Sequence, residues 1–117
     1  MGNQVCFFEI GCKDLAANKA FYGSLFDWKL ADHGNSTMID TGDKAGIQGH
    51  INSLGHEPHQ YILFYVLVDD IEKYLAKAVS LGGKQIVPKV EVPSMGWFAW
   101  FSDPGGNMIG LWKTMQQ

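Results

Sequence analysis

The feature that most constrains the fold is an internal repeat, in which the second half of the chain loosely copies the first. Asp14 and Asp70 each open a helical pattern, and they stand 56 positions apart. At the same spacing Leu25 corresponds to Leu81. A half of about 55 residues buries little surface alone, so we expect the two halves to share one core.

The spacing of apolar residues predicts the same order of elements, β-α-β-β-β, in each half. A strand-like run precedes each aspartate, which is a good helix N-cap, and three further strand-like runs follow each helix. In the first helix Ala17, Phe21 and Leu25 recur every four residues, and Leu15 and Tyr22 widen this series into one helical stripe. The predicted strands are 4–12, 28–30, 37–39, 46–51, 61–68, 84–92, 97–101 and 107–112; the helices follow Asp14 and Asp70 and end near 25 and 81, and a turn is expected at 33–35.

This pattern indicates an α+β protein with one domain over residues 1–117. The first module covers about residues 4–52 and the second about 60–114, joined by a linker at 53–59 that contains Gly55 and Pro58. A cleft between two related sheets is the first place to look for function.

Composition and charge exclude several classes of partner. The net charge is -3, whereas non-specific nucleic-acid binding needs a basic surface. No apolar run approaches the roughly 18 residues of a membrane span. Cys6 and Cys12 lie on one predicted strand, too far apart to bond, and two unpaired thiols fit a reducing compartment. We therefore expect a cytoplasmic protein with no nucleic-acid or membrane partner.

Three stretches of the sequence carry a more specific signal. They are Asp14-Leu15 with Ala20-Phe21-Tyr22 and Leu25-Phe26, then Asp69-Asp70-Ile71 with Ala78 and Leu81-Gly82-Gly83, and lastly the run from Trp97 to Asn107. In this order they resemble the vicinal oxygen chelate superfamily, also called the glyoxalase/bleomycin-resistance/dioxygenase family, over nearly the whole chain. The resemblance implies two tandem modules that form a curved mixed sheet around a ligand cleft, usually in a homodimer.

The resemblance also implies a divalent metal in the lyases, isomerases and dioxygenases of the family. Carried over position by position, its ligand sites fall on Phe7, Leu63 and Gly110. These side chains offer no lone pair to a metal. We therefore expect no metal and no other cofactor, as in the metal-lacking branch related to lactoylglutathione lyase.

Polar candidates for a ligand site lie on two predicted strands. Glu9 shares a strand face with Phe7, where an acid among aromatic groups can act as a catalytic base or a hydrogen-bond anchor. The alternative is a strand-end carboxylate that is partly exposed or paired with a lysine. Gln48 and His50 share one face of a later strand, and they either contact a ligand or lie on a solvated rim.

Aromatic residues gather near the C-terminal end. Alternation points Trp97 and Phe101 to one side of their strand and Phe98 and Trp100 to the other, so that one set packs on a helix and the other lines the cleft. On the last strand the small Gly110 leaves room for a ligand. The predicted ligand-binding residues are Phe7, Glu9, Gln48, His50, Leu63, Tyr65, Trp97, Phe101, Met108 and Gly110, with Glu9 also the candidate catalytic residue.

Three functions follow from these features. The first is a glyoxalase-like, resistance-type homodimer that binds a small, largely apolar or aromatic molecule without metal. The second is a lyase or isomerase that uses Glu9 as its base. The third is a structural dimer whose cleft is filled by its own side chains. Empty metal positions favour the first and third, and an inward-facing Glu9 favours the first and second.

Overall fold

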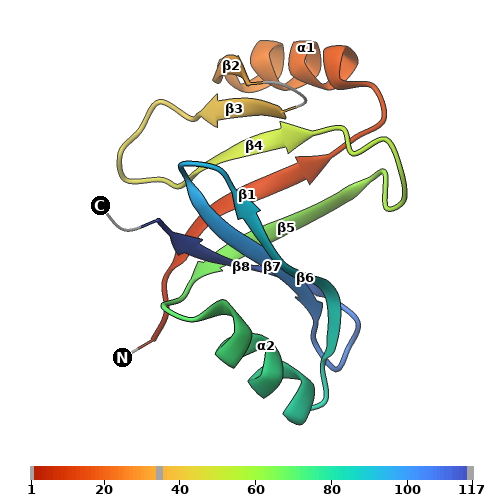
Figure 1. Ribbon diagram of the computed structural model, residues 1–117. Helices are drawn as coiled ribbons and strands as arrows, with labels where there is room; N and C mark the ends of the chain where they lie inside the picture. The colour runs from red at the N-terminus through yellow and green to blue at the C-terminus, as the bar shows by residue number, and fades with distance from the viewer. Residues whose placement is uncertain (1, 34–35, 116–117) are drawn as a thin grey trace. The chain divides into compact units, whose positions relative to one another are not determined.

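The order of helices and strands agrees with the sequence prediction. The computed structural model describes residues 2–33 and 36–115, so part of the predicted turn at 33–35 lies outside it. Within these residues no helix is long and apolar enough to cross a membrane. The elements are β1 (Val5–Gly11), α1 (Leu15–Phe26), β2 (Lys29–His33), β3 (Ser36–Asp40), β4 (Gln48–Asn52), β5 (Tyr61–Leu67), α2 (Ile71–Ser80), β6 (Lys84–Val92), β7 (Gly96–Ser102) and β8 (Met108–Thr114) (Figure 1).

The chain forms two compact units whose boundaries fall within β1 and β5. We call residues 7–63 the first module, and residues 1–6 with 64–117 the second module. Strand order is β2-β3-β4-β1 in the first module and β6-β7-β8-β5 in the second. β1 runs parallel to β4 and β5 runs parallel to β8, while the other neighbours are antiparallel. The α+β plan with a repeated mixed sheet is confirmed.

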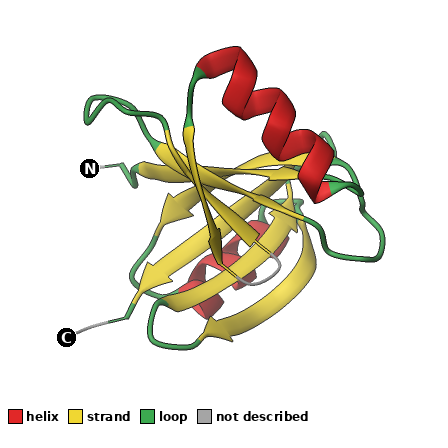
Figure 2. Cartoon of the chain, turned by 90° about the horizontal axis from the view of Figure 1, so that it is seen from above, coloured by secondary structure: helices red, strands yellow, loops and turns green. Residues whose placement is uncertain are grey.

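Each module has its own hydrophobic cluster, so the expectation of one shared core is wrong. In each module a helix covers one face of the sheet (Figure 2). Side chains of that helix and of the strands pack together in the cluster. The first cluster contains Ile10, Cys12, Ile39 and Ile51; the second contains Val68, Ile71, Leu75, Ala99 and Leu111. α2 contributes the buried Ile71 and Leu75 to its cluster, whereas α1 contributes the partly buried Leu15 and Tyr22.

Both helices begin at the predicted residues. The Asp14 carboxylate accepts a hydrogen bond from the Ala17 backbone N–H at 3.0 Å, and Asp70 accepts one from Lys73 at 3.1 Å. These bonds satisfy backbone donors that the first helical turn leaves without partners. The repeated aspartates therefore fix where each helix starts.

Only part of the predicted stripe of α1 packs against the sheet. Phe21 and Leu25 are 58% and 57% exposed, and Ala17 is exposed as well. Leu15 and Tyr22 pack against the first cluster instead. Since residues seven apart also share a helix face, the helix is rotated so that this pair, and not the i, i+4 series, meets the sheet.

Candidate functional site

Parallel pairing of β1 with β4 brings the predicted polar residues of the first module together. Phe7 lies opposite Gln48 and Glu9 lies opposite His50 in the strand register. Ile10, their neighbour on β1, packs in the cluster under α1. Because side chains alternate along a strand, Phe7 and Glu9 lie on the sheet face opposite α1.

Glu9 is almost completely buried, with 2% of the residue exposed. Its Oε1 atom accepts a hydrogen bond from His50 Nε2 at 2.9 Å, and its Oε2 atom accepts one from the Tyr61 hydroxyl. Burying a carboxyl group without such donors would be costly. The alternative of an exposed or lysine-paired carboxylate is therefore wrong, and the structure forms a Glu9–His50–Tyr61 cluster.

Tyr61 completes this cluster and is not among the residues predicted from the sequence. Its ring lies against Gly11, where any side chain would collide with it. Burial, and then the negative charge of Glu9, raise the pKa of the Tyr61 phenol above its ordinary value. The hydroxyl therefore remains protonated and serves as a donor to Glu9. Gly11, two residues after Glu9, has no side chain and so leaves space for the Tyr61 ring. A glycine inside a strand is therefore the sequence signal that another group lies close to this point.

The imidazole of His50 is the more accessible part of the cluster. The exposed fraction of its side chain is 17%, against 2% for Glu9. Its Nε2 atom faces the Glu9 carboxyl group, and this contact orients the ring. In functional histidines, a hydrogen bond to one ring nitrogen commonly sets the orientation of the other. The Phe7 ring lies 5.3 Å from the imidazole, centroid to centroid. A ligand on this face would therefore meet an oriented imidazole beside an aromatic ring.

Gln48 has a local role in the structure. Its side-chain oxygen accepts hydrogen bonds from the backbone N–H of Thr41 and from the Thr41 hydroxyl, the latter at 3.1 Å. Its amide nitrogen donates to the backbone carbonyl of Asp43 at 3.4 Å. The Gln48 amide thus anchors the loop that leads into β4.

In the second module, the predicted space above Gly110 is filled. Tyr65 lies opposite Gly110 in the β5–β8 register, and its ring occupies the place where a side chain of residue 110 would stand. The Tyr65 hydroxyl accepts a hydrogen bond from Trp100 Nε1 at 2.8 Å, and Phe98 packs edge-on at 6.5 Å. The expectation that Gly110 leaves room for a ligand is therefore wrong, because Gly110 makes room for Tyr65.

The aromatic residues of β7 alternate between the two faces of the strand as predicted. The set that was expected to line the cleft, however, lies on the face covered by α2. Trp97 and Phe101 pack against the α2 cluster, beside Ala99. Phe98 and Trp100 take the face that carries Tyr65. Trp97 and Phe101 were expected to line the cleft beside a ligand. They lie instead on the strand face that is covered by α2, which is also the face of the fully buried Ala99. Leu63 is buried, and Met108 is half-buried opposite Ser102.

The positions implied for metal ligands do not fit a metal. Phe7, Leu63 and Gly110 contribute no donor atom, and Tyr65 occupies the space at Gly110. Across residues 2–33 and 36–115, no group of three or more His, Cys, Asp or Glu side chains is placed to hold an ion. The absence of a metal remains a prediction.

Comparison with known proteins indicates the family. A model of the Glyoxalase/Bleomycin resistance protein/Dioxygenase superfamily matches residues 4–111. The putative glyoxylase CFP32 of Mycobacterium tuberculosis is 28% identical over 114 residues, covering 91% of this chain and 44% of that protein. The anthracycline biosynthesis protein DnrV of Streptomyces peucetius is 26% identical over 125 residues, covering 92% and 46%. The chain thus spans about half the length of these relatives.

The same fold occurs in solved structures. Hypothetical protein BH1468 from Bacillus halodurans matches with a TM-score of 0.71 at 14% sequence identity, covering 100% of this chain and 98% of that one. At this identity the similarity establishes the architecture alone.

Proposed function

Because the chain belongs to the Glyoxalase/Bleomycin resistance protein/Dioxygenase superfamily, we propose that it binds a small, largely apolar or aromatic molecule without a metal. The binding surface is the face of the first module that carries Phe7 and His50. The observation that carries the proposal is the hydrogen bond from His50 to the buried Glu9. This bond holds the His50 imidazole in one orientation on the sheet face, next to the ring of Phe7.

This arrangement supports a particular kind of ligand. An imidazole held by a buried carboxyl group is pre-organised, so little side-chain entropy is lost when it forms a hydrogen bond to a ligand. The Phe7 ring offers a flat apolar contact at 5.3 Å from the imidazole. The ligand therefore combines a flat apolar body with one carbonyl, hydroxyl or amide group.

A lyase or isomerase that uses Glu9 as its base is the second candidate. The buried carboxyl group beside two titratable side chains favours it, since such clusters occur at catalytic sites. However, each oxygen of Glu9 accepts a hydrogen bond, and the residue is 2% exposed. Proton transfer to Glu9 would therefore have to pass through His50 or Tyr61. The third candidate, a structural dimer with a filled cleft, is supported by the Tyr65 ring over Gly110.

A ligand screen by thermal shift tests the first proposal. A ligand present at 100 times its dissociation constant stabilises the folded state by about 2.7 kcal/mol, which raises the melting temperature measurably. We expect hits among flat aromatic ketones, phenols and amides, and we expect His50→Ala to abolish their shifts. His56→Ala, at an exposed imidazole, is the matched control. Hits that are unaffected by His50→Ala would contradict the proposed site.

Metal analysis distinguishes the metal-free proposal from family chemistry that depends on an ion. We expect protein purified without an affinity tag to contain well below one equivalent of nickel, zinc, iron or manganese. One tightly held equivalent would overturn the proposal, since family positions Phe7, Leu63 and Gly110 supply no ligands.

We also propose that the chain functions as a homodimer through α1. Three large apolar side chains of this helix are more than half exposed: Phe21 (58%), Leu25 (57%) and Phe26 (52%). Aromatic side chains are enriched at protein interfaces, and an apolar helix surface of this kind is typical of a contact with a second copy.

A further inference from the structure

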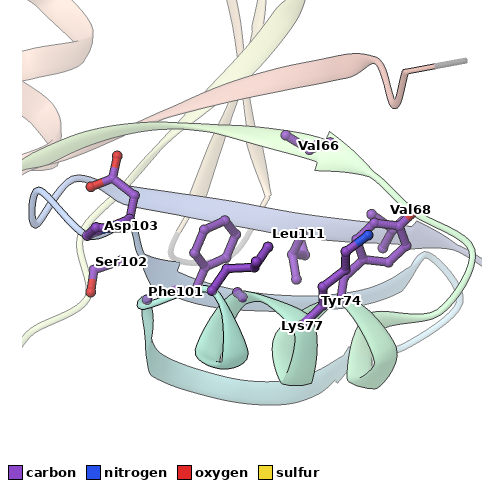
Figure 3. A pocket seen from close by; sticks show the side chains of 12 residues that line it. Val66, Val68, Tyr74, Lys77, Phe101, Ser102, Asp103 and Leu111 are labelled. Atoms are coloured by element: carbon purple, nitrogen blue, oxygen red, sulfur yellow. The ribbon is translucent and has the colours of Figure 1, made fainter.

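A cavity in the second module lies apart from the residues of the proposed function. Its volume is about 360 Å³, within the range of about 300–1,000 Å³ that small-molecule sites occupy. It lies between α2 and the sheet, and Phe101 and Leu111 form its centre (Figure 3). Its lining includes Lys77, Ala78, Gly83 and Asp103.

The internal repeat explains why this space is open. In the first module Tyr22 of α1 stacks on Trp28, with 5.7 Å between the ring centroids, and both pack against the cluster under α1. At the spacing of 56 positions that separates Asp14 from Asp70, Tyr22 corresponds to Ala78. Trp28 directly precedes β2, and the residue that directly precedes β6 is Gly83. The second module therefore lacks two rings where the first has them, and Ala78 lines the cavity.

The cavity has one charged group of each sign among its lining residues. Lys77 and Asp103 are its two charged lining residues, and Figure 3 shows them at opposite ends. The Asp103 carboxylate accepts hydrogen bonds from the backbone N–H groups of Gly105 and Asn107, at 3.0 and 2.9 Å. No ion pair to Lys77 is formed within the described residues. The carboxylate of a ligand would therefore pair with Lys77, at the end of the cavity away from the negative charge of Asp103.

We propose that this cavity binds a small apolar monocarboxylic acid. The hydrocarbon part lies against Phe101 and Leu111 in the space that Ala78 leaves open, and the carboxylate pairs with Lys77. Burial of the hydrocarbon provides most of the affinity, because each methylene group removed from water adds to it. The ion pair with the exposed Lys77 selects the acid over a neutral molecule of the same shape.

The test is an NMR titration of the isotope-labelled protein with decanoate, and in parallel with decanol. We expect decanoate to shift the backbone amide signals of Ala78, Gly83 and Phe101, and to leave those of Glu9 and His50 in place. Decanol should bind at the same amides about two- to five-fold more weakly, as an exposed ion pair allows. Shifts confined to β1 and β4, or no shifts at all, would overturn the proposal.

Two variants give independent tests. Ala78→Tyr restores the ring found in the first module and should abolish decanoate binding, whereas Ala76→Tyr places the same ring on the exposed side of α2 as a control. Lys77→Gln should reduce affinity for decanoate to that of decanol and leave decanol binding unchanged. Undiminished decanoate binding by either Ala78→Tyr or Lys77→Gln would refute the site. If Ala78→Tyr does not fold, Lys77→Gln and the mapped amides decide the question.

Discussion

At the scale of single residues, the Glu9 carboxyl group depends on its two donors. Water is almost excluded from it, so His50 and Tyr61 replace the hydrogen bonds that water would supply. A buried acceptor that loses one partner retains the cost of desolvation without the compensating bond. The cluster should therefore be sensitive to the loss of a single oxygen atom.

Replacing Tyr61 by phenylalanine removes that oxygen and keeps the ring over Gly11. We expect Tyr61→Phe to lower the free energy of unfolding by about 1 to 3 kcal/mol, because Glu9 stays buried with one donor fewer. Urea unfolding measures the change. Tyr22→Phe, on a helix of the same module, should cost less than about 0.5 kcal/mol. Equal costs for the two variants would mean that the Tyr61 hydroxyl does not support Glu9.

Sequence reasoning identified Glu9 and His50 separately but could not pair them. The two residues are 41 positions apart, and Glu9 is 52 positions from Tyr61. Their contacts depend on which residue of β4 lies opposite which residue of β1, and a shift of one residue would turn His50 to the other face. Local pattern gives the face of each residue, and only the strand register gives its partner.

At the scale of secondary structure elements, the turn between β7 and β8 is held by one carboxylate. Asp103 accepts hydrogen bonds from the Asn107 side-chain amide and from the backbone N–H groups of Asn107 and Gly105. These bonds, that of the Asn107 side chain first, lower the pKa of Asp103 below its ordinary value of 3.8. The charged form is therefore favoured by folding.

A lowered pKa determines how this turn responds to acid. The Asp103 carboxylate contributes fully to stability above the unfolded-state pKa of about 3.9. This contribution is lost as the pH falls through the lower pKa of the folded state. We expect Asp103→Asn to be less stable than the wild type at neutral pH and to approach it as the pH falls toward about 2. Urea midpoints across this range measure the difference, with Asp69→Asn as the exposed control. A constant difference between Asp103→Asn and wild type at every pH would contradict the role of the charge.

Element boundaries were the most predictable part of the fold, because their signals are local. Asp14 and Asp70 accept backbone hydrogen bonds at the starts of the two helices, as their positions before apolar periodic runs indicated. Which part of the α1 stripe packs was not predictable, since Ala17, Phe21 and Leu25 form as regular an apolar series as Leu15 and Tyr22, the two residues that contact the cluster. Which side faces the sheet depends on Trp28 and Leu30, which follow the helix and fill the cluster beneath it.

At the scale of the whole molecule, the exposed side of α1 provides the test of the proposed homodimer. Phe21→Asp places a charge at a side chain that is 58% exposed, so the fold should persist while association weakens at least ten-fold. Sedimentation velocity over a range of concentrations measures the change. Val79→Asp, at an exposed position of α2, should leave association unchanged. A wild-type chain that remains monomeric at high concentration would refute the homodimer.

The repeat predicted the architecture of both modules, but it did not predict their different interiors. Tyr22 and Trp28 of the first module correspond to Ala78 and Gly83 in the second, and both of these small residues line the cavity. The spacing of apolar residues predicts which positions face the interior, but it does not predict the volume of the side chains at those positions. The cavity therefore became visible only with the side chains in place.

Separate hydrophobic clusters have an evolutionary consequence. A chain that arose by duplication and kept a single interior would have to adjust both halves whenever one changed. Here each half has its own hydrophobic cluster, which is covered by its own helix. Substitutions that enlarge or reshape the hollow half can accumulate without disturbing the half that carries the oriented imidazole, so the two copies are free to diverge toward different tasks.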